Sequence, residues 1–203
     1  LCTTSCIEDN FTTSSNHLLE FSCDTLSFDT MFTELGSPTK QFIIYNRHKQ
    51  MINISSISFE GNENARFFMN VDGMKGNEFN NVEIRGGDSI YVFVESLINA
   101  TNQNAPLEIK DRIKFVTNGV TQWVVLTAWG QDVTRLTRPE YNADYRMTAD
   151  RPYVIFDTLH VAEGATLTSD AGTTLYFHDK AAMKIDGTII ANGTQQNPIH
   201  LRG

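Results

Sequence analysis

The chain contains 203 residues, of which 40% are hydrophobic and 20% charged, as is typical of a globular protein of one or two domains. Its formal net charge of −8 would repel nucleic-acid phosphates, and no run of Lys or Arg offsets that charge locally, which excludes nucleic acid as a partner. No stretch approaches the roughly 20 apolar residues of a membrane span, so membrane attachment would need a lipid or a partner.

The composition favours strands over helices. The sequence has 13 Phe and six Tyr, many Thr, Asn and Ile, and only five Pro, and it contains no convincing amphipathic helix. We therefore expect an all-β protein. The three cysteines Cys2, Cys6 and Cys23 are confined to the N-terminal end, where they neither form a distributed disulfide framework nor have the spacing of a zinc site.

The first six residues, LCTTSC, resemble the end of a bacterial lipoprotein signal peptide, in which small residues precede a cysteine that is acylated after cleavage. The resemblance implies lipidation at Cys6 and makes residues 1–19 a signal-peptide remnant, lipidation site and flexible tether. Glu8 and Asp9 are similar to surface-export signals of Bacteroidetes lipoproteins, which implies the outer membrane, with the cell surface favoured over the periplasmic face. Two alternatives stay open: a disordered tail with incidental cysteines, or a Cys6–Cys23 disulfide.

Residues 20–132 contain short alternating runs separated by turn signals, a pattern typical of a β-sandwich. The apolar positions Ile54 and Ile57 are three residues apart, which predicts a β-bulge between them. The expected strands are Phe21–Phe28, Lys40–Asn46, Met51–Phe59, Arg66–Val71, Asn81–Ile84, Ser89–Ser96, Ile109–Thr117 and Val120–Trp129.

The last two of these strands flank Asn118-Gly119, which suits a type I′ hairpin because both central residues can adopt positive φ. After the turn, Val124 and Leu126 fall on one face of the strand, whereas Trp123 and Val125 fall on the other. A strand that is apolar on both faces is typical of a central position in a sheet.

The motifs between Leu26 and Asp132 resemble the immunoglobulin-like domains of the ASPM, SPD-2 and hydin group and their bacterial envelope relatives. The resemblance implies an immunoglobulin-like β-sandwich that acts as a spacer or binding platform and has no catalytic residues. A departure occurs at Val94-Glu95, where the wider group more often has Phe-x-Pro. In chain order the motifs are LSFDTMFTELGSPTKQFIIYNR, INISSI, FFMNVDG, EIRGGDSIYVFVE, IKFVTNG and VVLTAWGQD.

Residues 133–152 are charged, polar and irregular, and we expect an interdomain linker there, with a short strand possible near Tyr145–Thr148. From Tyr153 the pattern becomes short alternating runs that end at turns and repeat. Leu159 and Val161 align with Met183 and Ile185 at a shift of 24, Leu175 and Phe177 with Ile199 and Leu201 at the same shift, and Leu167 with Ile189 at 22.

This repeat resembles a right-handed parallel β-helix, so residues 153–203 are expected to form its first coils, two in number. The inward positions would be Leu159, Val161, Leu167, Leu175, Phe177, Met183, Ile185, Ile189, Ala191, Ile199 and Leu201. Because a solenoid needs about three or more repeats and a cap, we expect either that the natural chain continues past Gly203 or that another chain covers this end.

We predict no catalytic residue, cofactor or metal anywhere in the chain. Asp170, Asp179, Asp186 and Glu163 sit beside corners, where acidic residues favour turn hydrogen bonds, and a general acid/base pair needs convergent carboxylates. His160 would fall opposite Lys184 and His200 opposite Tyr176, so the three histidines, with His178, do not stack as metal ligands. Tyr153 and Tyr176 are more consistent with packing than with a sugar site.

Two kinds of modification signal occur. Thr25, Thr30, Ser89 and Thr158 lie in Asp-Ser/Thr-aliphatic motifs that resemble Bacteroidetes O-glycosylation sites, although strand composition also explains them. Asn-x-Ser/Thr sequons begin at Asn10, Asn53, Asn99 and Asn192, and they arise readily by chance in a sequence rich in these residues.

The sequence thus predicts a non-enzymatic, lipid-anchored envelope protein that serves as a structural or binding module for an outer-membrane or surface partner, most simply an envelope protein. A glycan ligand has no support in the sequence. The alternatives are the N-terminal part of a β-helix carbohydrate-active enzyme or glycan-binding protein, and an adhesin or fibre subunit that uses exposed strand edges.

Overall fold

The computed structural model describes residues 10–61 and 65–203 and divides the chain into two compact units. The first unit contains the described residues up to Thr101 together with Leu107–Gly130, and the second contains Asn102–Pro106 with Gln131–Gly203. The regular elements of the described residues are all strands, as expected, and no helix among them is long and apolar enough to cross a membrane.

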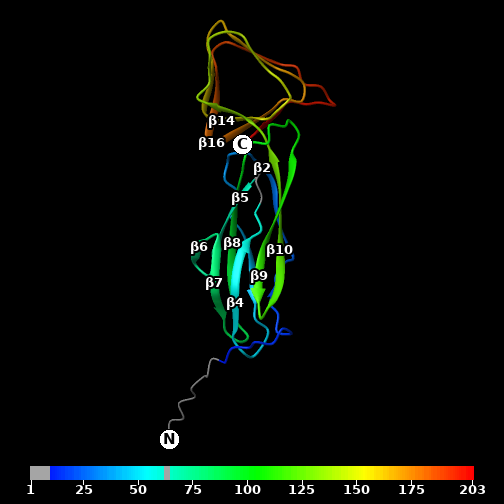
Figure 1. Cartoon of the computed structure of the whole chain (residues 1–203). Coiled ribbons are helices and arrows are strands. Elements are labelled where there is room, and N and C mark those ends of the chain that lie inside the picture. The colour runs from blue at the N-terminus through cyan, green and yellow to red at the C-terminus, as the bar shows by residue number, and fades with distance from the viewer. Residues whose placement is uncertain (1–9, 62–64) are drawn as a thin grey trace. The chain divides into compact units, whose positions relative to one another are not determined.

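The first unit is a β-sandwich of two five-stranded sheets (Figure 1). One sheet contains, in spatial order, β1 (Glu20–Phe21), β3 (Lys40–Tyr45), β8 (Ser89–Ile98), β5 (Ala65–Val71) and β6 (Met74–Gly76). The other contains β2 (Thr25–Phe32), β10 (Val120–Gln131), β9 (Leu107–Thr117), β4 (Ile52–Phe59) and β7 (Glu78–Ile84). The eight expected strands are therefore present with shifted ends, and β6 and the break between β1 and β2 were not predicted.

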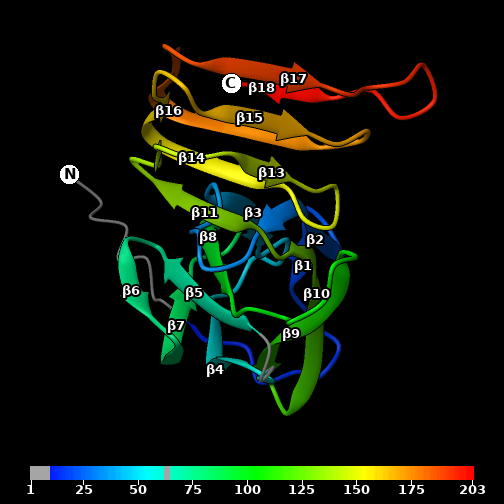
Figure 2. The same cartoon turned by 90° about the horizontal axis from the view of Figure 1, so that it is seen from above.

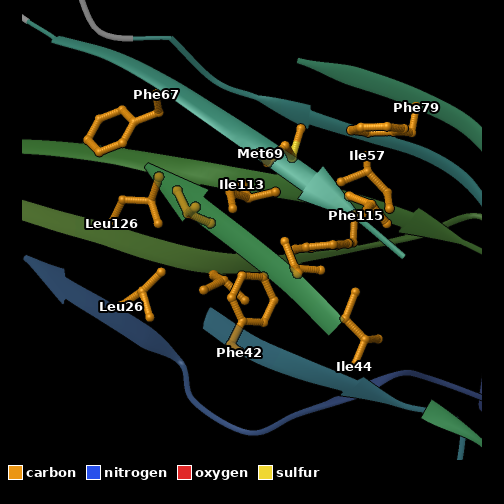
Figure 3. Packing of buried hydrophobic residues seen from close by; sticks show 14 of the residues in the cluster. Leu26, Phe42, Ile44, Ile57, Phe67, Met69, Phe79, Ile113, Phe115 and Leu126 are labelled. Carbon is orange, nitrogen blue, oxygen red and sulfur yellow. The ribbon is translucent and has the colours of Figure 1, made fainter. Parts of the chain in front are cut away.

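A single hydrophobic core fills the space between these sheets. Phe42 and Ile44 of β3 contribute from one sheet, and Ile113, Phe115 and Leu126 of β9 and β10 contribute from the other (Figure 3). Phe115 is fully buried, and its ring lies 4.9 Å from that of Phe21 and 6.2 Å from that of Phe42, centroid to centroid. Alternation along longer strands such as β5 and β8 places every second side chain in this core.

The hairpin and the bulge are confirmed. Asn118 and Gly119 have φ values of 52° and 78°, as the type I′ turn requires, and β9 pairs with β10 from Thr117–Val120 to Leu107–Gly130. The register of β4 against β9 shifts between Ile54 and Ser56. β10 lies between β2 and β9, yet its outer face is not buried, and Trp129 is 44% exposed.

The second unit is a parallel β-solenoid of about three turns. Figure 1 shows a roughly triangular coil, and Figure 2 shows the coils stacked. One sheet has the order β11 (Thr134–Thr137), β14 (Tyr153–Val161), β16 (Thr174–Ile185) and β18 (His200–Arg202), with β12 (Glu140–Tyr141) also paired to β14. The other contains β13 (Tyr145–Met147), β15 (Thr166–Ser169) and β17 (Thr188–Ala191).

We predicted a linker at residues 133–152 and two coils after it. The structure instead places the first coil of the solenoid in this interval. Its strands β11 and β12 pair with β14, and β13 pairs with β15 at Tyr145–Leu167. The prediction was wrong because the strands of this coil are two to four residues long, too short to show alternation. The short strand allowed near Tyr145 is present.

Two of the three predicted coil alignments are confirmed. Leu159 pairs with Met183, Val161 with Ile185, and Leu167 with Ile189. The third was wrong, because Leu175 pairs with Leu201, two residues beyond the expected Ile199. The corner before β18 contains an additional turn, in which the Thr194 amide donates to the Asn197 carbonyl at 3.1 Å.

The inward row of the solenoid is buried wherever coils lie on both sides of it. Leu159, Val161, Leu167 and Leu175 are at most 1% exposed, and Phe177, Met183 and Ile185 are half-buried. The last coil has a neighbouring coil on one side only, so its inward positions Ile189 and Leu201 are 44% and 60% exposed, Ala191 is exposed and Ile199 is half-buried.

We expect Phe115→Ala to lower the free energy of unfolding by about 3–5 kcal/mol, because it leaves a cavity between the two sheets. Urea unfolding followed by the fluorescence of Trp123 and Trp129, both in the sandwich, measures this loss. Phe68→Ala is the matched control, because Phe68 is 43% exposed and its loss should cost about 1 kcal/mol or less. Equal losses in the two variants would contradict the assignment of the core.

Candidate functional site: an aromatic groove on the sandwich

The outer face of the sheet β1-β3-β8-β5-β6 carries exposed aromatic side chains. β8 alternates strictly, so Val92 and Val94 are fully buried, whereas Tyr91 and Phe93 are 47% and 36% exposed. Phe68 on the neighbouring strand β5 is 43% exposed. The rings of Tyr91 and Phe93 have centroids 6.2 Å apart and an interplanar angle of 20°, so they form a strip of two stacked rings along β8.

A groove with a volume of about 640 Å³ adjoins this strip. Phe68 and Phe93 supply its apolar surface, and Asn70, Lys75, Thr39 and Glu95 are among the polar residues that line it. These residues come from β5, β6, β8 and the turn before β3, which the sheet order brings together. Large exposed apolar surfaces on folded proteins are commonly interaction sites.

Aromatic and polar side chains alternate on the floor of the groove. Phe68 on β5 lies directly opposite Glu95 on β8, and Asn70 on β5 lies opposite Phe93. Each ring therefore has a polar neighbour across the strand pair as well as along its own strand. The groove presents apolar faces and hydrogen-bonding groups at alternate positions.

The polar groups of the groove are partly preorganised. The Thr39 hydroxyl donates to the Glu95 carboxylate at 2.7 Å, which orients that carboxylate. The side-chain oxygen of Asn70 is buried and has no hydrogen-bond partner among residues 10–61 and 65–203. An acceptor in this state is stabilised by a ligand that donates a hydrogen bond. One carboxylate and one ammonium group, on Glu95 and Lys75, leave the groove without net charge.

On the outer face of the opposite sheet one aromatic ring, that of Trp123, is covered from within the chain. The Arg112 guanidinium lies 4.5 Å from the centroid of the Trp123 ring and donates two 2.6 Å hydrogen bonds to Glu60. These bonds lower the pKa of Glu60 and raise that of Arg112. The exposed Trp129 is thus the principal unshielded ring of that sheet.

A row of charged side chains crosses the outer surface of the solenoid. Glu140 pairs with His160, and His160 with Lys184, on successive coils. The His160 Nε2 lies 2.8 Å from Asp186, Lys184 Nζ donates to the same carboxylate at 2.6 Å, and His160 Nδ1 lies 3.7 Å from Glu140. Donation from Lys184, and next from His160, lowers the pKa of Asp186. This arrangement joins coils and satisfies its own charges.

The other acidic residues considered for catalysis do not converge. Asp170 accepts from Arg146 at 2.9 and 3.0 Å, Asp179 occupies a positive-φ corner position at 55°, and Glu163 lies in an exposed turn. Each engages a partner or a turn, as expected for corner residues.

The three histidines of the solenoid are also dispersed, whereas Tyr141 and Tyr145 stack with their ring centroids 4.4 Å apart. The His178 ring packs on that of Phe156 at 4.7 Å, and His200 pairs with Thr174, not with Tyr176 as predicted. Within the described part of the chain no group of three His, Cys, Asp or Glu side chains is placed to hold a metal ion. Tyr153 is buried, and Tyr176 is half-buried.

The predicted modification sites lie in different environments. Cys6 is outside the described residues, and Cys23 is a half-buried free thiol whose pKa burial and the neighbouring Asp24 raise. Thr25 and Thr30 are exposed on β2, whereas Ser89 and Thr158 are half-buried in β8 and β14. Of these four predicted O-glycosylation sites, the two threonines on β2 are the exposed ones.

No protein-family model matches the chain, and no curated protein sequence matches it. Among solved structures it is similar to the VesB protease of Vibrio cholerae (10% identity, TM-score 0.37, 59% of this chain and 33% of that one). It is similar to a family 123 glycoside hydrolase from Clostridium perfringens (7%, 0.37, 57% and 26%) and to the Bacillus cereus major pilin subunit BcpA (8%, 0.34, 62% and 44%). The chain thus matches less than half the length of each, and these TM-scores carry no functional information.

Sequence reasoning missed the groove. Alternation in residues 89–96 already indicated that Tyr91 and Phe93 share a face, but which face is exposed depends on the opposite sheet. The contributions of Phe68 and Asn70 depend on the pairing of β5 with β8, which the sequence does not specify.

We expect the carboxyl group of Asp186 to titrate below its ordinary value of 3.8, because Lys184 and His160 donate to the ionised form. The charged row that includes His160, Lys184 and Asp186 therefore stabilises the coils at pH values above 3.8. This contribution is lost as the pH falls through the depressed pKa of Asp186 in the folded state. Carboxyl ¹³C NMR titration measures the midpoint, and Lys184→Met should raise it. A midpoint at or above the ordinary value would contradict the arrangement.

Proposed function

We propose that this protein is a non-enzymatic, lipid-anchored module of the cell envelope that binds a surface ligand through the aromatic groove of its sandwich. The observation that carries the proposal is the strip formed by Tyr91 and Phe93 beside the groove, where rings that core packing would normally bury are held at the surface. The sandwich supplies a rigid platform for this strip, because β8 is the central strand of its sheet.

The electrostatics of the solenoid support a structural role for that unit. Asp186 and Asp170, two of the acids considered for catalysis, are each engaged in ion pairs, with Lys184 and Arg146 respectively. A general acid needs a carboxyl group whose pKa is raised, whereas that of Asp186 is lowered. The solenoid therefore suits the role of a stalk or scaffold.

The anchor in this proposal is a lipid on Cys6, supported by the LCTTSC sequence and the polar residues that follow it. We expect the native protein to partition into the detergent phase of a Triton X-114 extract and Cys6→Ser to move it to the aqueous phase. Cys2→Ser is the matched control and should leave partitioning unchanged. Detergent-phase partitioning of Cys6→Ser would contradict the anchor.

The binding role is tested with isolated cell envelopes of the source cells and the full chain carrying Cys6→Ser, which removes the contribution of the lipid. We expect this protein to co-sediment with envelopes and a further Tyr91→Ser/Phe93→Ser change to reduce co-sedimentation about tenfold or more, because two aromatic contacts are lost. Trp129→Ser, on the opposite sheet, is the matched control and should bind normally.

Thermal unfolding of each variant verifies that the sandwich remains folded. Undiminished co-sedimentation of the Tyr91→Ser/Phe93→Ser protein, or an equal loss in Trp129→Ser, would overturn the groove as the binding surface.

A further inference from the structure

We infer that the ligand of the aromatic groove is an uncharged glycan chain, and this inference rests on the proposed function. It names the chemical class that the groove fits, which the binding role alone does not. The observations that carry it are the pattern of the groove floor, the balance of its charges and the acceptor on Asn70.

The pattern of the floor matches the two kinds of surface on a sugar ring. Opposite pairs Phe68–Glu95 and Asn70–Phe93 place an aromatic ring next to an amide or carboxylate in both directions across β5 and β8. A pyranose presents apolar C–H faces and a rim of hydroxyl groups a few ångströms apart. The rings of the groove can stack on the faces while the neighbouring polar groups bind the rim.

The strip on β8 gives the ligand a direction. Tyr91 and Phe93 lie next to each other on one face of the strand, with nearly parallel rings 6.2 Å apart. Two nearly parallel rings in a row can contact successive units of a ligand, so the site binds an oligosaccharide better than a single sugar. Phe93 lines the groove, and Tyr91 extends the aromatic surface beyond it.

The charges of the groove favour an uncharged ligand. Glu95 and Lys75 are its charged side chains among the residues described, and the whole chain has a net charge of −8. A polyanion such as a sulfated glycan or a nucleic acid would meet a repulsive field without a cationic cluster to offset it. A polycation would meet a single carboxylate that already accepts from Thr39.

Asn70 offers its side-chain amide to a ligand that carries hydroxyl groups. Its side-chain oxygen is buried and has no partner in residues 10–61 and 65–203, and sugar hydroxyl groups are donors. A lipid chain offers no donor to this oxygen, so lipid binding gains nothing at this atom. An added peptide strand would need a long free edge, whereas the edge strand β6 next to the groove spans three residues.

The test uses the full Cys6→Ser chain on an array of neutral, sialylated and sulfated oligosaccharides. We expect binding to neutral oligosaccharides, with a loss of about tenfold or more in Phe93→Ser from the missing ring contact. Asn70→Ala should weaken binding, whereas Asn70→Asp, which keeps the acceptor, should retain more of it. Trp129→Ser should bind normally.

A second arm separates this inference from the proposed function by treating the cell envelopes before co-sedimentation. Periodate, which oxidises vicinal diols, should abolish groove-dependent binding, and protease digestion should not. Loss after protease alone would identify a protein partner and overturn the glycan inference while the binding role stands.

Array binding confined to sialylated or sulfated glycans, or binding that Phe93→Ser does not change, would also overturn the inference. Absence of array binding together with protease-sensitive envelope binding would overturn it as well. If the Tyr91→Ser/Phe93→Ser protein binds envelopes normally, that result overturns the proposed function itself, whatever the ligand.

Discussion

The two-residue alternation of the β-strand is the constraint on which both units of this protein depend. In the sandwich, burial of Val92 and Val94 between the sheets requires Tyr91 and Phe93 to face outwards. In the solenoid, burial of Leu159 and Val161 requires His160 to face outwards, in line with Glu140 and Lys184. The same geometry therefore builds the core and selects the residues available for function.

Aromatic residues on the outer face of a sheet have a structural explanation that must be weighed against a functional one. Phe and Tyr favour strands, and aromatic neighbours on one face stabilise a sheet by up to about 1 kcal/mol. That explanation covers Tyr91 and Phe93 as a pair. It does not account for the groove beside them, for the acceptor on Asn70, or for a Glu95 carboxylate oriented by Thr39. These additional features favour a binding role over sheet stabilisation.

Much of the fold could be predicted from local sequence, because local chemistry determined it. Asn118-Gly119 specifies its hairpin through positive φ at two positions, and the three-residue step from Ile54 to Ile57 marks a bulge. Long alternating runs such as β8 and β9 are recognisable without their partners. The first solenoid coil was missed because β12, with two residues, contains no alternation, and its strand character comes from pairing with β14.

The groove could not be predicted because it depends on pairing between strands distant in sequence. Asn70 and Phe93 become neighbours only through the register of β5 against β8, and a one-residue slip would place Asn70 beside a buried valine instead. Thr39 reaches Glu95 only because β3 flanks β8 on the other side. Short segments contain the residue types of such a site but not their adjacency.

The solenoid shows why coils of unequal length preserve their pattern. Between the pairs Phe156–His178 and Thr158–Ala182, β16 has two more residues than β14, accommodated near Asp157 and Asp179, both with positive φ. The corner before β18 is four residues longer than the corner between β15 and β16, because Ser169 pairs with Ala191 whereas Thr174 pairs with His200, and Leu175 consequently pairs with Leu201. An insertion of two restores the original face, whereas one residue would turn every following inward side chain outwards. Within β16 and before β18 the length therefore changes in even steps, which keeps the apolar row in phase. The first coil differs, because one more residue lies between Phe156 and His160 than between their partners Thr137 and Glu140. Arg138, which has positive φ, lies in this shorter corner, and the charged row still runs from Glu140 to Lys184.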